Sequence, residues 1–323
     1  GGRLKTQDIS NNHIVASSLT VYMFERFLNY LEYKGASKTI PNASKISGRK
    51  KLQQNSFPSD AVASFDHGKW DRVLQYHVDV AAGNIDDVKG INMVDYDAIA
   101  KDPNFSDYLT QLEEADPTKL YPAEQLAFWI NAYNALCINI IIQYETEKSV
   151  KIQSITNLTN KDNAVWNQVA GKVAGADISL NTIEHERLRK EWDEPLVHAC
   201  IVCASASCPN LRPEAFVAAR LQEQMEEQMK NWIKNPTKGA KLLDDGKVQL
   251  SRIFLWFRDD FGSHEGIANF LLKYWQEEDV KEKLKKQKFS HRYFTYSWKI
   301  NRTTNKKDWQ HDSTPDDSVQ LQA

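Results

Sequence analysis

Apolar residues recur at the spacing of an α-helix in several parts of the chain. Trp70, Val73, Leu74, His77 and Val78 follow one another every one to four residues, which places them on one helical face. The same spacing predicts further helices at residues 17–33, 105–114, 124–144, 213–233 and 267–275. Ser17 or Ser18 would cap the helix at 17–33, and Pro213 would start the helix at 213–233.

Shorter apolar runs predict strands. Residues 196–202 are the best candidate, because the run is short, apolar and rich in β-branched residues. Residues 152–177 read as short strands and loops, and residues 293–300 alternate as a strand does. Asp244-Asp-Gly-Lys is typical of a hairpin turn.

Many helices with a few separated strands favour an α+β fold, a mostly helical single domain packed around a small central sheet. We divide the chain into an N-terminal extension (1–63), this α+β domain (64–302) and a polar, disordered tail (303–323). The extension combines a helix with a flexible loop. We interpret its basic cluster, Gly48-Arg49-Lys50-Lys51, as a solvated linker rather than a binding patch.

Composition narrows the function classes. The 323 residues are 41% hydrophobic and 26% charged, with a net charge of −2, as expected for a globular protein. This balance gives no basic field to attract nucleic acid, so we expect no nucleic-acid partner. The most apolar run, residues 135–142, is shorter than the roughly 20 residues that span a bilayer, and predicts no membrane span.

The compartment stays open at this stage. The sequence begins Gly1-Gly2, without methionine, so a targeting segment could precede it. Glycosylation sequons begin at Asn42, Asn104, Asn157 and Asn301, and such triplets are common by chance. A disulfide between Cys203 and Cys208 would favour a secreted or lumenal protein.

Potentially reactive side chains are most concentrated between His185 and Cys208. This stretch holds three of the four cysteines, two of the eight histidines and the two serines of Cys203-Ala-Ser205-Ala-Ser207-Cys208. Nucleophiles and bases at this density indicate a reactive site, a metal site or a disulfide.

A zinc site is the weakest of these readings. His198, Cys200, Cys203 and Cys208 resemble a four-ligand set, but only one C-x-x-C pair is present. If residues 196–202 form a strand, Cys200 and Cys203 point to opposite faces and cannot converge. We therefore assign no metal ligand and no cofactor.

A thiol site has several candidate members. Cys208 or Cys203 would be the nucleophile, with Ser205 or Ser207 as a variant, and His198 or His185 the base. Glu184, Asn131 or Asn134 would orient that base. Equally, the two sulfurs could form a disulfide, and Cys137 and Cys200 could simply be buried.

Asn131 and Asn134 share one sector of the helix predicted at 124–144, whose other faces are apolar. A helix this apolar is expected to be buried, and buried amides need partners. One interpretation is that they tie down loop backbone. The alternative is that one of them orients a catalytic histidine.

Five segments, in this order, resemble the family of domains of unknown function numbered 547. They are Phe65-Asp-His-Gly-Lys-Trp70-Asp, residues 124–136 around Trp129-Ile-Asn131-Ala-Tyr133-Asn134, residues 180–189 around Ile183-Glu184-His185, residues 198–211, and residues 250–261. The ending Tyr296-Ser-Trp298-Lys-Ile-Asn301 resembles the closing strand of the family, so the resemblance spans Phe65 to Asn301.

The resemblance implies candidate positions but no activity. The positions that match the family pattern are Asn131, Tyr133, Asn134, Glu184, His185, His198, Cys203, Ser205, Cys208 and Pro209. Cys200 departs from the pattern, because the family usually has a plain apolar residue there. Three hypotheses follow: a binding or scaffold domain with a structural polar network around His198 and Cys203/Cys208, a thiol-dependent hydrolase or acyl transferase, and a metal-dependent enzyme. The partner would be a small molecule, a peptide or a protein.

Overall fold

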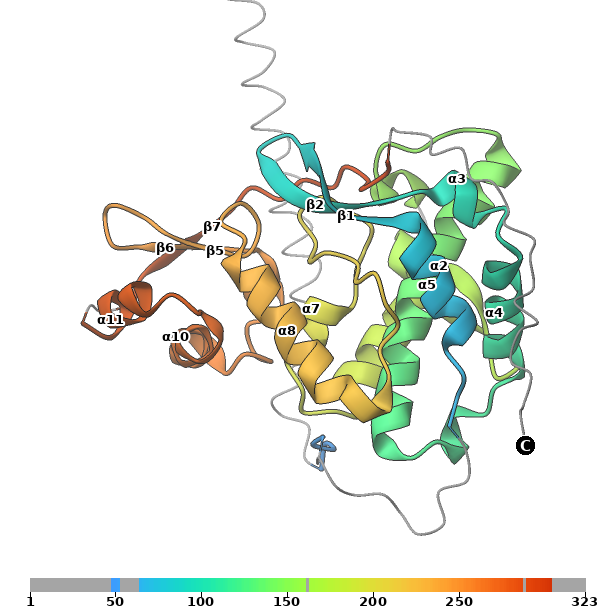
Figure 1. Cartoon of the computed structure of the whole chain (residues 1–323), viewed down its shortest axis with the longest axis horizontal. Coiled ribbons are helices and arrows are strands. Elements are labelled where there is room, and N and C mark those ends of the chain that lie inside the picture. Colours follow the sequence, from blue (N-terminus) through green and yellow to red (C-terminus); the bar gives the residue numbers. More distant parts are fainter. Residues whose placement is uncertain (1–47, 53–63, 161–162, 287–288, 304–323) are drawn as a thin grey trace, which may run out of the picture.

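The computed structural model describes residues 48–52, 64–160, 163–286 and 289–303 (Figure 1). The α+β class is confirmed. The helices are α2 (Gly68–His77), α3 (Tyr96–Ile99), α4 (Pro103–Glu114), α5 (Pro122–Lys148), α6 (Leu180–Thr182), α7 (Val197–Cys200), α8 (Leu221–Lys234), α9 (Ile253–Trp256), α10 (Ser263–Tyr274) and α11 (Glu278–Lys286). The 3₁₀ turns are η2 (Pro117–Lys119), η3 (Ile155–Leu158), η4 (Val165–Asn167) and η6 (Ala218–Arg220), and η5 (Ile183–Arg189) is a π-helix.

The strands of the described residues form three separate small sheets. The first is the antiparallel hairpin of β1 (Val78–Ile85) and β2 (Val88–Val94), and the second pairs β3 (Val169–Val173) with β4 (Ala176–Ser179). In the third, β6 (Val248–Leu250) lies between antiparallel β5 (Ala240–Leu242) and parallel β7 (His291–Tyr293). The core is therefore built on a helix instead of one dominant sheet.

That helix is α5. Pro122 occupies its first turn, where a missing N–H costs nothing, and Ser149 ends it with a left-handed φ of 52°. Its residues from Leu126 to Ile141 are all buried, so the helix is enclosed on every side. By length and composition α5 could cross a membrane, but 89% of its most apolar window is buried inside the protein.

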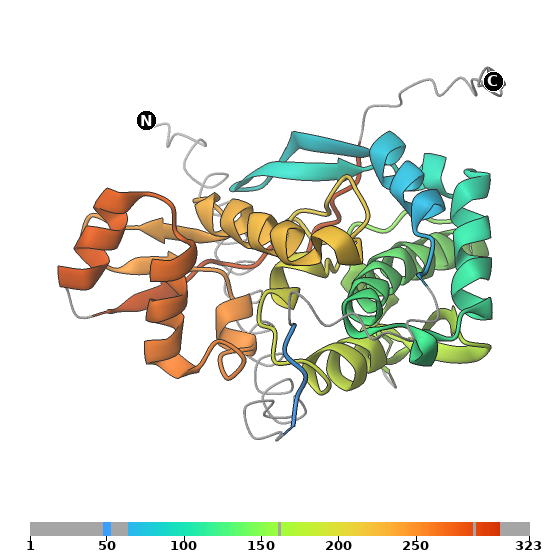
Figure 2. The same ribbon diagram turned by 60° about the horizontal axis from the view of Figure 1, so that its bottom comes forward.

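Helix α5 lies in the same part of the molecule as α2 and α4 (Figure 2). Helices α2 and α4 lie at one end of the molecule, and α10 and α11 lie with the three-stranded sheet at the other. Between them, α8 and the β1–β2 hairpin run across the same side of the protein.

Several predicted elements are confirmed: α2, α4, α5, α10 and the β5–β6 hairpin all fall where the apolar spacing and turn residues put them. Two predictions are wrong. The segment predicted as a strand at 196–202 contains the short helix α7, because its apolar residues pack on every side of a buried turn. The helix predicted from Pro213 begins only at Leu221, after an extended segment that hydrogen-bonds to α5 and to Asp71.

Residues 293–300 form only a partial strand, since β7 ends at Tyr293 and the rest makes isolated bridges. The helix predicted at 17–33 and most of the tail lie outside the described residues. The interpretation of the basic cluster as a solvated linker is wrong for residues 49–50. Arg49 pairs with Asp193 at 2.6 Å, and the Lys50 backbone bonds to Glu191 and Asp193, so this segment is attached to the domain.

Candidate functional site

Asn131 and Asn134 each clamp a stretch of backbone. Asn131 donates to the carbonyl of Phe216 at 2.7 Å and accepts its N–H at 3.0 Å. Asn134 donates to the carbonyl of Cys200 at 2.9 Å and accepts the N–H of Val202 at 2.8 Å. Both ends of each amide therefore bind loop backbone, and neither amide orients a histidine as one hypothesis required.

A charged network includes His198 of α7. It consists of Arg189, Asp260, His198 and His185. The guanidinium of Arg189 donates two hydrogen bonds to the Asp260 carboxylate, at 2.6 and 3.1 Å. His198 Nε2 lies 2.7 Å from the same carboxylate, and His185 Nδ1 lies 2.8 Å from Arg189.

The charges of this network are compensated within it. Despite burial, the hydrogen bonds from His198 and Arg189 hold the pKa of Asp260 far below its usual range. Burial lowers the pKa of His198, and burial together with the Arg189 cation lowers that of His185 to about 4. His198 also stacks on Phe257, with ring centroids 4.2 Å apart. The polar groups of the network thus have partners within it.

A cysteine–histidine pair is one of the alternatives that the sequence leaves open. In the described part of the chain, the hydrogen bonds of the two histidines go to Asp260 and Arg189, and none joins either ring to a sulfur. Asp260, instead of a thiol, is the partner of His198 in this structure.

The sulfurs instead belong to a thiol cluster, defined here as Cys203, Ser205, Cys208 and Tyr296. The Cys203 backbone N–H donates to Cys208 Sγ at 3.2 Å, and so does the Tyr296 hydroxyl, also at 3.2 Å. Cys203 Sγ lies 3.3 Å from Ser205 Oγ and 3.5 Å from the Tyr296 hydroxyl. The Ser205 hydroxyl donates to Tyr296 at 3.1 Å.

The two thiols contact the same tyrosine hydroxyl, and the ionisation of each affects the other. Despite burial, the neighbouring Cys203 and Tyr296 lower the pKa of Cys208 to about 6. The neighbouring Cys208, together with burial, raises the pKa of Cys203 well above its usual value. The pair therefore loses its first proton easily and its second with difficulty.

All four cysteines are free thiols, so Cys203 and Cys208 form no disulfide in this structure. Cys137 and Cys200 are buried, and burial raises the pKa of both. Within the described residues, no three His, Cys, Asp or Glu side chains are grouped so that they could hold a metal ion.

The thiol loop, residues 203–208, is held by a C-terminal segment, residues 296–301. Backbone hydrogen bonds run from Ala206 to Lys299 (2.8 Å), from Ser207 to Ser297 (3.3 Å) and from Asn301 to Ala204 (2.9 Å). Ala204 has a left-handed φ of 61°, which is costly for a residue with a Cβ. The loop thus presents its sulfurs in a conformation that the neighbouring segment maintains.

Glu184 connects the two polar regions. It lies on η5, accepts a hydrogen bond from Tyr133 at 3.3 Å, and is 6% exposed. Burial raises its pKa to about 7. Arg189 opposes the shift, whereas Asp260 and Cys208 add to it. A buried carboxyl that titrates near neutrality is a candidate acid or base.

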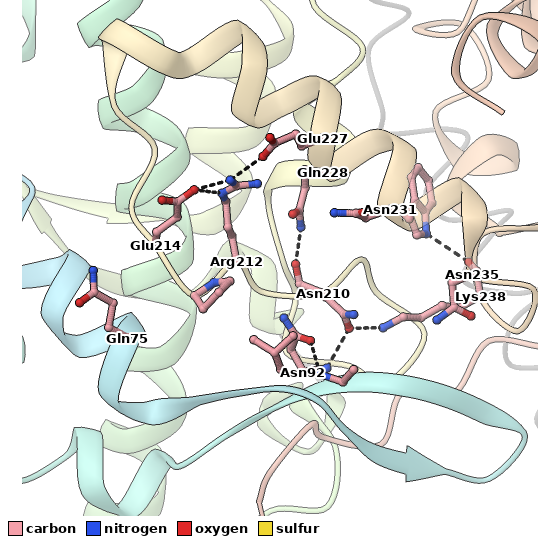
Figure 3. A pocket seen from close by; sticks show the side chains of 14 residues that line it. Gln75, Asn92, Asn210, Arg212, Glu214, Glu227, Gln228, Asn231, Asn235 and Lys238 are labelled. Carbon is pink, nitrogen blue, oxygen red and sulfur yellow. Dashed lines mark hydrogen bonds and ion pairs between the residues drawn. The ribbon is translucent and has the colours of Figure 1, made fainter. Parts of the chain in front are cut away.

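A polar cavity of about 610 Å³ lies near the thiol loop (Figure 3). Its walls come from α8, the β1–β2 hairpin and the loop after Cys208. They are rich in amides, with charges at two ends, and the lining residues include Gln75, Asn92, Asn210, Arg212, Glu214, Glu227, Gln228, Asn231, Trp232, Asn235 and Lys238.

Lys238 joins this cavity to the thiol loop. Its ammonium is 2% exposed and donates to Asn210 Oδ1 at 2.6 Å and to the Ala206 carbonyl at 3.3 Å. Burial lowers its pKa to about 8, while the nearby thiols of Cys208 and Cys203 favour its charged form.

Residues 117–233 match the family described as "Protein of unknown function, DUF547". The match confirms the resemblance for α5, η5, α7, the thiol loop and α8, which hold every predicted site residue of the sequence analysis. Neither a curated protein nor a solved structure matches the chain.

Residues outside the DUF547 match complete the site. Asp260, Lys238 and Tyr296 each contact the matched region through a buried polar group, and none was a predicted site residue. Asp260 and Tyr296 lie in segments that carried the resemblance, but nothing in the sequence indicated which side chain would face a thiol or a histidine. Whether Cys208, Cys203, His198, His185, Glu184, Asn131 and Asn134 are catalytic stays a prediction.

Proposed function

We propose that the domain binds a small zwitterionic molecule, of the chemical class of a dipeptide, in the polar cavity beside α8. The observation that supports this most directly is the cavity's combination of size and lining. A volume of about 610 Å³ is in the range of small-ligand sites, and the walls offer amide donors and acceptors to a peptide unit.

The charges at the two ends of the cavity suit a zwitterion. At one end Arg212 bonds to two carboxylates, those of Glu214 at 2.7 Å and Glu227 at 2.7 Å, so this group has an excess of negative charge for a ligand ammonium. At the other end, Lys238 provides the positive charge for a carboxylate. Opposite charges at the two ends of the cavity favour one orientation of the ligand.

Internal hydrogen bonds support these walls before any ligand arrives. The Asn92 backbone donates to Asn210 Oδ1 at 3.0 Å, and the Asn92 side chain donates to the Leu211 carbonyl at 2.8 Å. The Gln228 amide donates to the Asn210 carbonyl (Figure 3). Groups fixed in this way lose little conformational entropy on binding.

A thiol-dependent hydrolase is less well supported by the same contacts. It needs a base beside the sulfur, and both histidines bond to Arg189 and Asp260 instead. The binding hypothesis requires no such pair, and it agrees with a structural role for the charged network.

Isothermal titration calorimetry with alanyl-alanine tests the proposal. We expect binding by the wild-type protein, and affinity about tenfold lower for each derivative with one blocked terminus, N-acetylated or amidated, because each lacks one charge. Asn231→Trp adds bulk to the exposed helix position that lines the cavity, and should abolish binding.

Lys234→Trp is the matched control, since it places the same ring on an exposed position of α8 that does not line the cavity. It should bind alanyl-alanine as the wild type does. Absence of binding by the wild type, or equal binding by the Asn231→Trp variant, would refute the proposal.

A further inference from the structure

The two sulfurs of the thiol cluster share their partners. The Tyr296 hydroxyl lies 3.2 Å from Cys208 Sγ and 3.5 Å from Cys203 Sγ, and the Cys203 backbone N–H donates to Cys208 Sγ at 3.2 Å. Two cysteines that share a contact atom, with four residues between them in one loop, can be joined as a disulfide by side-chain rotation.

One of the sulfurs is prepared to be a thiolate. Cys208 Sγ accepts from the Cys203 N–H and the Tyr296 hydroxyl, and the Lys238 cation lies nearby. Hydrogen-bond donors and a cation stabilise the thiolate, which is the nucleophilic form of cysteine. Cys203 remains protonated beside it and can serve as the resolving thiol.

Access to the pair is narrow. Cys208 is 3% exposed, and Cys203 is half-buried. The Tyr296 ring packs against Trp256 and Trp298, at centroid distances of 4.8 and 4.5 Å, and these rings cover the tyrosine. This exposure favours small reagents such as hydrogen peroxide over a protein disulfide, which would have to bring its own sulfur to a buried thiol.

We propose that Cys203 and Cys208 are a redox pair that a small hydroperoxide oxidises to a reversible disulfide. The Cys208 thiolate attacks the terminal oxygen of the hydroperoxide. An S–O bond forms as the O–O bond breaks, and the leaving oxygen takes a proton to become water or an alcohol. Cys208 is then a sulfenic acid.

The Cys203 sulfur next attacks the sulfur of that sulfenic acid. The S–S bond forms, the S–O bond breaks, and the departing hydroxide combines with the Cys203 proton as water. In sum, two thiols are oxidised to one disulfide and one peroxide O–O bond is reduced. A dithiol reductant reverses the reaction by thiol–disulfide exchange.

Peptide mapping of the full-length wild-type chain under non-reducing conditions tests this. After hydrogen peroxide treatment and trypsin, the peptide 191–220, which contains Cys200, Cys203 and Cys208, should carry one disulfide between 203 and 208. Dithiothreitol should restore the free thiols. A disulfide that involves Cys200, or oxidation of Cys208 straight to sulfinic acid, would overturn the proposal.

Variants assign the order of events. In Cys203→Ser the sulfenic acid has no resolving thiol, so dimedone should label residue 208. In Cys208→Ser, oxidation at Cys203 should be at least about tenfold slower than the wild-type reaction, because the stabilised thiolate is missing. An unchanged rate in Cys208→Ser would contradict the scheme.

Cys200→Ser is the control for folding and for peptide position, and should form the 203–208 disulfide like the wild type. The redox pair does not depend on a ligand in the polar cavity, so the Asn231→Trp variant should also oxidise normally. If only the Asn231→Trp variant fails to form the disulfide, that substitution disturbs the loop. If the wild-type protein oxidises rapidly but does not bind alanyl-alanine, only the proposed function is refuted.

Discussion

The charged network around Asp260 and the thiol cluster around Tyr296 are two buried polar regions that share Glu184 as an electrostatic neighbour. In the network each group has a partner of fixed charge, and the pKa shifts of Asp260 and His198 keep one protonation state. In the thiol cluster two groups compete for the same donors, and their pKa values move in opposite directions. Full compensation favours rigidity, whereas the opposed pKa shifts of the two thiols make the thiol cluster the better candidate for chemistry.

The largest effect should come from breaking the network at its centre. Asp260→Asn removes the carboxylate from Arg189 and His198 and leaves a guanidinium buried without its counter-charge. We expect a loss of about 3–5 kcal/mol in the free energy of unfolding, measured by urea denaturation. Asp259→Asn is the control, because its ion pair with Arg258 is long (3.8 Å) and exposed. Equal stability of the two variants would show that the network is not structural.

The second effect is a dependence of stability on pH. The folded state holds the pKa of His185 at about 4, below its ordinary value of 6.5, so the unfolded chain binds the proton first as pH falls. Stability should therefore decrease between pH 6.5 and 4, by about 1.4 kcal/mol per pH unit for this group.

His185→Gln keeps a hydrogen-bond acceptor for Arg189 but cannot take up that proton. Chemical denaturation at several pH values should give a shallower slope for this variant in the same window. Slopes that coincide would mean that His185 has the same affinity for protons in both states.

The third effect tests the thiol cluster. Tyr296→Phe removes the hydroxyl that donates to Cys208. The pKa of Cys208, about 6 in the intact cluster, should rise by about one unit or more. The pH dependence of alkylation by iodoacetamide measures it.

Several neighbouring groups interact with the Cys208 thiol and so influence its pKa. They are Cys203, Ser205, Tyr296, Lys238, Glu184, Tyr133 and Cys137. Tyr293→Phe is the matched control, since its hydroxyl bonds to His291 at 2.7 Å. If both variants alkylate with the wild-type profile, Tyr296 does not stabilise the thiolate.

The smallest effect concerns the strain in the thiol loop. In Ala204→Gly, relief of the left-handed φ offsets the lost methyl burial, so stability should change by less than about 0.5 kcal/mol. Ala206→Gly loses an equally buried methyl at a residue without positive φ, and should cost about 1–2 kcal/mol. Thermal denaturation would compare them, and equal losses would show that Ala204 is unstrained.

Local patterns predicted the long helices well. The spacing of Trp70, Val73 and Leu74 indicated α2, and the apolar sides of α5 indicated a buried helix. Residues 196–202 were misassigned because a short apolar run fits a strand and a buried helical turn equally well. Pro213 suggested a helix start, but Asn131 and Asp71 bind the backbone after it in an extended form.

For the polar groups around α7 and the thiol loop, the sequence indicated where they gather but only partly how they pair. The density of Cys203, Ser205 and Cys208 pointed to the thiol loop, and the apolar setting of the asparagines indicated backbone clamps as one interpretation. The partners Asp260 and Tyr296 lie 62 and 88 residues away from His198 and Cys208. Tertiary packing selects such distant partners, and the spacing of apolar residues along the sequence contains no information about that packing.

The attachment of the C-terminal segment to the thiol loop determines when the thiol cluster can form during synthesis of the chain. Tyr296 follows Cys203 by 93 residues, and the backbone bonds that hold the loop come from residues 297–301. While a ribosome is still translating the intervening helices, both cysteines have emerged without their hydroxyl donor or their cover. The nascent chain therefore has ordinary thiols, and the activated pair arises only when the last strand-like residues dock, as a late and non-local step of folding.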